Sequence, residues 1–126
     1  MTMTHTLTIP GQLPGLNEYI AAERGGGGKY SAAAMKRDAE RVIGLCARSQ
    51  LREIHFTAPV TMRYTWYEPN RKRDKDNIAF ARKFIQDAPV AASVLQGDGW
   101  ACIKGFSDTF EVDRENPRVE VIISTK

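Results

Sequence analysis

The 126-residue sequence contains few residues that bind metals through nitrogen or sulfur. Its two cysteines, Cys46 and Cys102, lie far apart, and its two histidines, His5 and His55, are equally isolated. Structural zinc sites need four such ligands at short spacings, and a disulfide framework needs more than one cysteine pair. The sequence therefore predicts neither, and it indicates two reduced thiols.

The sequence also lacks a long hydrophobic run. Crossing a bilayer as a helix takes about 20 apolar residues, and the charged, apolar and small-residue segments of a signal peptide are missing as well. These absences favour a cytoplasmic protein. With 126 residues, of which 42% are hydrophobic, the chain can bury one modest core. We therefore expect a single domain over residues 1–126.

The sequence also lacks a large excess of positive or negative charge. The 18 Lys and Arg residues face 15 Asp and Glu residues, and the net charge of +3 does not by itself indicate a nucleic-acid partner. The segment 70–87 is less even, because it holds Arg71, Lys72, Arg73, Lys75, Arg82 and Lys83 against Asp74, Asp76 and Asp87. A basic rim around acidic residues is typical of a nuclease, since a plain DNA-binding patch needs no acids.

Three aspartates in and after this segment are candidate metal ligands. Asp74 and Asp76 are two residues apart, and Asp98 lies between Gly97 and Gly99. Alternate residues of an extended segment point to one side, so an extended chain would let the first two share a cation. Oxygen donors in an incomplete shell suit Mg²⁺ or Mn²⁺, which keep waters and accept phosphate oxygens. The simpler interpretation is that one of Asp74 and Asp76 caps a helix and that Asp98 is a turn residue.

The cations around these aspartates are candidate phosphate ligands. Lys83 follows Asp76 by seven residues, so two turns of a continuous helix would place both near one face. There an ammonium group could neutralise charge on the reacting phosphate, although an ion pair with Asp87 is the alternative. The predicted contacts to neighbouring DNA phosphates are Arg71, Lys72, Arg73, Lys75, Arg82 and Lys29.

Two further features leave alternatives open. The glycine-rich segment 24–29 is not a nucleotide-binding phosphate loop, because Tyr30 follows Lys29 and no strand leads into it. It is either a basic loop that folds over DNA or a linker. Trp66, Tyr67 and Trp100 could stack on bases, but aromatic residues in strands more often belong to the core.

Hydrophobic periodicity predicts the element order β-α-β-α-β-β. The expected strands are 4–9, 58–67, 100–106 and 118–124, and the expected helices are 32–50 and 77–88. Residues 12–18 and 108–116 are predicted as loops. Asp76 or Asn77 is the expected cap of the second helix, and Pro89 its end. The inward residues of the first helix are predicted to be Met35, Ala39, Val42, Ile43 and Cys46. Such an order indicates a small α+β domain with a mixed sheet packed by two helices.

Several segments together resemble the RusA family of Holliday junction resolvases, most closely its phage and prophage branch. The segments are Arg73-Asp74-Lys75-Asp76-Asn77-Ile78, then Lys83-Phe84-Ile85-Gln86-Asp87-Ala88, then Gly97-Asp98-Gly99-Trp100. Agreement also covers residues 16–19, 105–108 and 115–121, so the resemblance spans nearly the whole chain.

The resemblance implies a RusA-like fold and a homodimeric, Mg²⁺-dependent crossover junction endodeoxyribonuclease. Such enzymes resolve four-way DNA junctions by paired symmetric nicks in DNA recombination and repair. The family pattern would place the metal on Asp74, Asp76 and Asp98 and its essential lysine on Lys83.

The sequence departs from the family pattern at two positions. The lysine of better-known members would fall at Phe80, and an acidic pair is replaced by Gly97-Asp98. Two alternatives therefore stay open. One is a catalytically degenerate protein that binds branched DNA, and the other is a general structure-specific nuclease that cuts flaps or forks.

Overall fold

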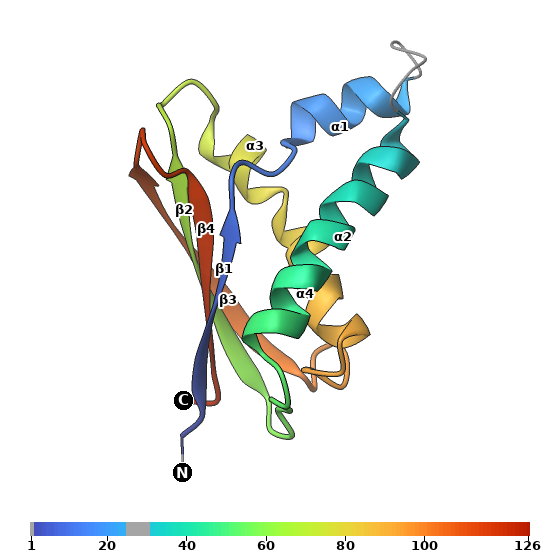
Figure 1. Cartoon of the computed structure of the whole chain (residues 1–126), viewed down its shortest axis with the longest axis vertical. Helices are drawn as coiled ribbons and strands as arrows, with labels where there is room; N and C mark the ends of the chain where they lie inside the picture. The colour runs from blue at the N-terminus through green and yellow to red at the C-terminus, as the bar shows by residue number, and fades with distance from the viewer. Residues whose placement is uncertain (1, 25–30) are drawn as a thin grey trace.

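The computed structural model describes residues 2–24 and 31–126, so the predicted DNA contact Lys29 lies outside the described residues. The elements in chain order are β1 (Thr4–Pro10), α1 (Leu16–Glu23), α2 (Ala32–Gln50), β2 (Val60–Glu68), α3 (Lys75–Ala79), α4 (Arg82–Ala91), β3 (Ile103–Val112) and β4 (Arg118–Ser124). The strands form one mixed sheet, and the helices lie on one side of it (Figure 1). The predicted α+β class with a mixed sheet is confirmed. No helix in the described ranges is long and apolar enough to cross a membrane.

The strand order in the sheet is β1-β4-β2-β3. β4 runs antiparallel to both β1 and β2, whereas β2 and β3 are parallel. The register of the parallel pair aligns Val60 with Ile103 and Glu68 with Val112. The carboxyl ends of β2 and β3 therefore meet at one end of the sheet, and β3 forms an edge.

The core lies between the sheet and the helices. The predicted alternation along β2 is confirmed, because its inward side chains are at most 1% exposed as far as Trp66. This burial excludes Trp66 from base stacking, and its indole Nε1 donates a hydrogen bond to Asp108 at 2.8 Å. Tyr67 lies on the other face of the sheet under the guanidinium of Arg118. Trp100, in contrast, is fully exposed.

The predicted loop 12–18 is wrong from Leu16 onward, where α1 begins. Glu18 stabilises the start of this helix, because its carboxylate accepts a hydrogen bond from the backbone N–H of Gly15. Tyr19 then packs its ring against Phe80 and Phe84. A helix of eight residues gains most of its stability from such contacts, so local sequence gave little sign of it.

The predicted helix 77–88 is divided into α3 and α4. At the junction, the N–H of Ala81 bonds to the carbonyl of Ile78, and the N–H of Lys83 bonds to that of Phe80. Hydrogen bonds between residues three apart are those of a 3₁₀ turn. Such a turn is tighter than an α-helical turn, and here it changes the direction of the helix axis. The helix also begins earlier, with Asp74 as its N-cap residue.

Pro89 does not end α4, which continues to Ala91. The ring is fully buried in the core, and this packing offsets the backbone hydrogen bond that proline cannot donate.

Two other predictions about the elements need correction. β3 extends through the predicted loop to Val112, because its polar residue Asp108 is held by Trp66 and Arg82 while the backbone pairs with β2. On α2 the buried stripe contains Met35, Ala39, Ile43, Gly44 and Ala47. Val42 is 42% exposed, so the predicted inward face was rotated by part of a turn.

Candidate functional site

A cavity of about 650 Å³ lies where β2 and β3 end. β2 contributes Glu68, β3 contributes its last residues from Phe110, and the intervening wall is the loop that leads into α3. Five of the predicted site residues line it, namely Arg71, Arg73, Asp74, Lys75 and Asp76. The structure thus gathers the central part of the predicted site at one end of the sheet.

The two aspartates of this cavity reach it from different backbone conformations. Asp74 is extended, with φ −68° and ψ 154°, whereas Asp76 lies in the first turn of α3. The Asp-Lys-Asp stretch is therefore not extended throughout, which was the condition under which the sequence would let the two aspartates share a cation. Both carboxylates nevertheless line the same cavity and are exposed.

The carboxylates of Asp74 and Asp76 remain available to a ligand. Among residues 2–24 and 31–126, the carboxylate of Asp76 accepts only a local hydrogen bond, from the N–H of Asn77 at 3.0 Å. Within the described part of the chain, neither aspartate forms an ion pair. Two exposed carboxylates that line one cavity fit the needs of Mg²⁺, which prefers oxygen donors and retains several waters.

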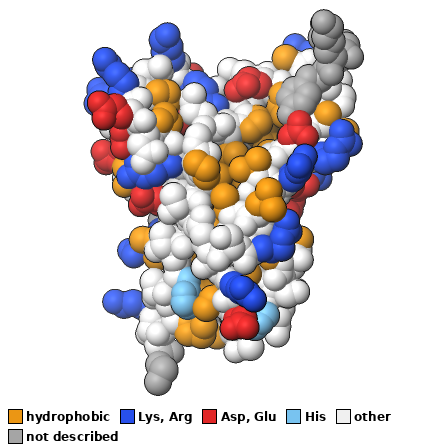
Figure 2. Space-filling view, viewed as in Figure 1, with side chains coloured by type: hydrophobic (Ala, Val, Ile, Leu, Met, Phe, Trp, Pro, Cys, Tyr) orange, Lys and Arg blue, Asp and Glu red, His pale blue; other side chains and the backbone are white. Residues whose placement is uncertain are grey.

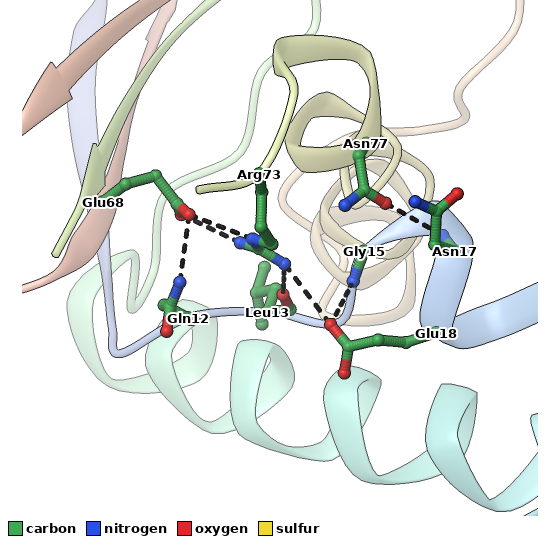
Figure 3. A network of polar contacts seen from close by, with 8 residues as sticks. All are labelled: Gln12, Leu13, Gly15, Asn17, Glu18, Glu68, Arg73 and Asn77. Carbon is green, nitrogen blue, oxygen red and sulfur yellow. Dashed lines mark hydrogen bonds and ion pairs between the residues drawn. The ribbon is translucent and has the colours of Figure 1, made fainter. Parts of the chain in front are cut away.

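Arg73 is half-buried at the cavity and holds the aspartate loop to the end of β2 (Figure 3). Its Nε and Nη2 donate to the two carboxylate oxygens of Glu68 at 3.0 and 2.9 Å. Its Nη1 donates to the carbonyl of Leu13 at 3.0 Å, and Gln12 adds a hydrogen bond to Glu68. The side chains of Arg73 and Glu68 are only 18% and 8% exposed. Arg73 therefore has a structural role in this loop, and its predicted contact with a DNA phosphate stays a prediction.

The first turn of α1 and its N-cap residue Gly15 contact the other side of the loop. Glu18 accepts from Gly15 and lies 3.5 Å from Nη1 of Arg73, and Asn77 accepts a hydrogen bond from the N–H of Asn17 at 2.8 Å (Figure 3). A Cβ at Gly15 would lie 2.7 Å from Oδ1 of Asn77. The N-terminal segment and the aspartate loop therefore fit together only with glycine at this position.

Sequence reasoning missed Glu68 as the anchor of this site. One signal was present, because the inward alternation of β2 continues from Trp66 to Glu68. A carboxylate on a buried face needs a cationic partner, and an arginine follows five residues later. The partners from residues 12–18 could not be found in this way, since their proximity depends on the tertiary fold.

Asp98 does not reach this cavity. The segment that contains it is held beside the start of β2, where Phe56 bonds to the carbonyl of Val94 and Val60 bonds to that of Cys102. The aspartate loop follows the other end of β2, which over eight residue steps is about 26 Å away. The predicted convergence of three carboxylates within one chain is therefore wrong. Among residues 2–24 and 31–126, no three Asp, Glu, His or Cys side chains could hold a metal together.

Lys83 is exposed on α4 and does not line the cavity. Its expected alignment with Asp76 fails because the junction between α3 and α4 interrupts the helix. No ion pair joins Lys83 to Asp87 in the described residues. Asp87 lies instead beside Glu40 of α2, where burial raises the pKa of the Glu40 carboxyl, Lys36 lowers it and Asp87 raises it.

The remaining predicted DNA contacts fall into two groups. Arg82 forms an ion pair with Asp108 and lies over the ring of Phe106, 4.4 Å from its centroid, so its guanidinium is already engaged. Arg71, Lys72 and Lys75 are exposed around the two aspartates. These three cations, close to free carboxylates, are the part of the basic rim that can contact a polyanion.

No protein-family model matches this chain, and no curated protein is significantly similar to it. The resemblance to the RusA family rests on the sequence motifs alone.

Proposed function

We propose that the protein is a Mg²⁺-dependent endodeoxyribonuclease of the RusA type, which resolves four-way DNA junctions by paired symmetric nicks. One observation carries the proposal. Asp74 and Asp76 line one cavity, form no ion pair with any residue that the structure describes, and have exposed cations beside them in the chain. A metal-assisted phosphodiester hydrolase needs this combination of hard oxygen donors and phosphate-binding charges. The motif resemblance supplies the choice of substrate.

Different residues of the chain would bind the metal, bind the DNA phosphates and position the loop. Asp74 and Asp76 would hold Mg²⁺, or Mn²⁺ in its place, which when bound activates a water and stabilises negative charge on the phosphate. Arg71, Lys72 and Lys75 would bind the flanking phosphates. Arg73 and Glu68 keep the loop in position. A homodimer would present two such sites related by symmetry, which is what two opposed nicks require in recombination or repair.

The test is cleavage of an end-labelled synthetic four-way junction in Mg²⁺. The wild-type protein should nick two opposed strands, and Asp76→Asn should bind the junction without cutting it. Glu53→Gln is the matched control, because this carboxylate is exposed and lies outside the cavity. Equal cleavage by Asp76→Asn and wild type would contradict the proposal.

A second function is supported by the position of Asp98. Because each chain brings only two of the three predicted carboxylates to the cavity, the protein could bind branched DNA without cutting it. Under this alternative, wild type and Asp76→Asn bind the junction equally and neither produces nicks.

A further inference from the structure

The outer face of α2 carries a row of exposed arginines, which consists of Arg37, Arg41, Arg48 and Arg52. At 3.6 residues per turn the first three share an arc of about 40°, turned away from the buried stripe of the helix. The fourth lies just beyond the end of the helix at Gln50. Figure 2 shows Lys and Arg side chains in a row along the course that α2 takes in Figure 1. The row is therefore a continuous positive surface along one helix.

The stability of the fold does not account for this row. Within residues 2–24 and 31–126, none of the four guanidinium groups forms an ion pair. Arg37 and Arg41 are four residues apart, and like charges at this spacing oppose helix formation. The helix dipole favours a cation only near the last turn, where Arg48 lies. A ligand of opposite charge would explain what helix stability does not.

The row ends at a second cavity, of about 510 Å³, where α2 gives way to the loop that leads to β2. Arg48 and Arg52 both line this cavity, so two guanidinium groups share one hollow of the surface. Glu53 also lines it, and the two arginines leave the lining net positive. Arg48 in addition reaches back along the helix, because a Cβ at Gly44 would lie 3.3 Å from its Nη1. This direction brings its charge closer to Arg41.

The backbone of duplex DNA is the polyanion that fits the row. From Arg37 to Arg52 a helix rises about 22 Å, the length of about six base pairs, and a duplex presents phosphates along all of it. Arginine binds phosphate oxygens through two parallel N–H donors. An acidic protein fits less well, because the centre of a protein interface is mostly apolar. Here one large apolar side chain, Leu45, lies exposed among four guanidinium groups.

We propose that the arginine row of α2 binds the phosphate backbone of a duplex arm, away from the site of cleavage. The inference rests on the proposed function, which supplies branched DNA as the ligand. At the aspartate cavity, Arg71, Lys72 and Lys75 would contact the phosphates beside the cut, and the arms of a four-way junction extend beyond that point. The row holds one such arm without reading its bases, since phosphate contacts carry no sequence information. It therefore adds affinity for long arms and leaves the choice of the cut to the cavity.

The experiment compares two variants that lose equal charge. Arg41→Gln/Arg48→Gln removes two cations of the row, and Arg63→Gln/Lys126→Gln removes two exposed cations that lie off α2. Fluorescence anisotropy of a labelled four-way junction with long arms gives the slope of log affinity against log salt. The first variant should reduce this slope by about 2, one for each lost phosphate contact, and the second should leave it unchanged. Arg41→Lys/Arg48→Lys should keep the wild-type slope, because both charges remain.

Cleavage of the same junction separates this inference from the proposed function. An unchanged slope for Arg41→Gln/Arg48→Gln beside paired nicks by wild type overturns the arm contact and leaves the nuclease intact. A reduced slope without any cleavage by wild type supports the arm contact and overturns the nuclease. An unchanged slope with lost binding to a polyglutamate probe would overturn the inference and assign the row to an acidic protein.

A single substitution at the other end of the row guards against a variant that fails to fold. Arg37→Gln alone should reduce the slope by about 1, and glutamine keeps a high helix propensity. Thermal unfolding should show the same melting temperature for this variant and wild type, because the guanidinium group forms no ion pair in the described ranges. A folded Arg37→Gln protein with the wild-type slope would overturn the arm contact.

Discussion

Neighbouring cations of the basic segment have different roles because their burial differs. Arg71 is exposed beside the cavity, whereas Arg73, two residues later, points inward and forms a bidentate pair with Glu68. A buried ion pair has lost its hydration, so the removal of one partner leaves an uncompensated charge in the interior. The proposed function therefore assigns the arginine at one position to DNA contact, whereas the arginine at the other position stabilises the loop.

Arg73→Ala should lower the free energy of unfolding by about 3 kcal/mol, because it leaves the carboxylate of Glu68 buried without its cation. Arg71→Ala should change it by less than about 0.5 kcal/mol, as is usual for an exposed residue. Urea denaturation of both variants measures the difference. An equal effect of the two substitutions would contradict the assigned roles.

Arg71→Ala should instead weaken DNA binding. Loss of one phosphate contact reduces the slope of log affinity against log salt by about 1. Fluorescence anisotropy of a labelled junction over a series of salt concentrations measures this slope. An unchanged slope would show that Arg71 does not contact a phosphate.

At the scale of elements, the aspartate loop and α3 are positioned by the segment before α1. Gly15 has φ −89°, which any residue can adopt, so its requirement is steric. An added Cβ would lie 2.7 Å from Asn77 Oδ1 and 3.0 Å from Arg73 Nη1. Both contacts belong to the network that holds the loop.

Gly15→Ala should therefore destabilise the fold by about 1–3 kcal/mol, the usual cost of inserting a methyl group into packed surroundings. Gly99→Ala is the control, because a Cβ there would meet no atom within 4 Å. Thermal unfolding of the two variants compares them directly. A stable Gly15→Ala protein would mean that the segment can move away from α3 at little cost.

The contact between α2 and α4 should make stability depend on pH. Burial raises the pKa of Glu40 above its ordinary value of 4.5, and Asp87 adds to the increase while Lys36 opposes it. The folded protein therefore holds this proton more tightly than the unfolded chain does. This contribution to stability is present below pH 4.5 and is lost as the pH rises through the raised pKa.

Glu40→Gln should consequently raise the melting temperature at neutral pH more than it does below pH 4.5. The neutral amide keeps the size of the side chain and removes the buried charge. Glu115→Gln, on an exposed residue, is the control and should have little effect at either pH. A uniform effect of Glu40→Gln across the pH range would contradict the assignment.

Local patterns predicted most elements of this protein but not the arrangement of the site. The alternating burial along β2 and β4 and the inward face around Phe84 could be predicted, because each depends only on the spacing of hydrophobic residues along the sequence. The position of Asp98 was not, since it depends on the direction in which β3 pairs with β2, and that pairing is set by contacts far apart in sequence. The division between α3 and α4 was hidden for a similar reason, because the aromatic packing of Phe80 with Tyr19 is tertiary.

At the scale of the whole molecule, the face that Figure 2 shows has apolar side chains between groups of charged ones. The proposed function requires a homodimer with two sites related by symmetry. Because only the folded chain would form this dimer, association should stabilise the folded state by mass action.

The melting temperature of the wild-type protein should therefore rise with protein concentration. Differential scanning fluorimetry over a dilution series measures this dependence. A melting temperature independent of concentration in the wild type would indicate a monomer.

The central claim is that the protein cuts two opposed strands of a junction with the aid of Mg²⁺. The most direct measurement uses a supercoiled plasmid with an extruded cruciform. The first nick releases the supercoiling and lets the cruciform be reabsorbed, so only paired cuts made within one binding event give linear DNA. The account predicts linear product for wild type with Mg²⁺ and none for Asp76→Asn. Nicked circles alone, or tight binding without any product, would contradict it.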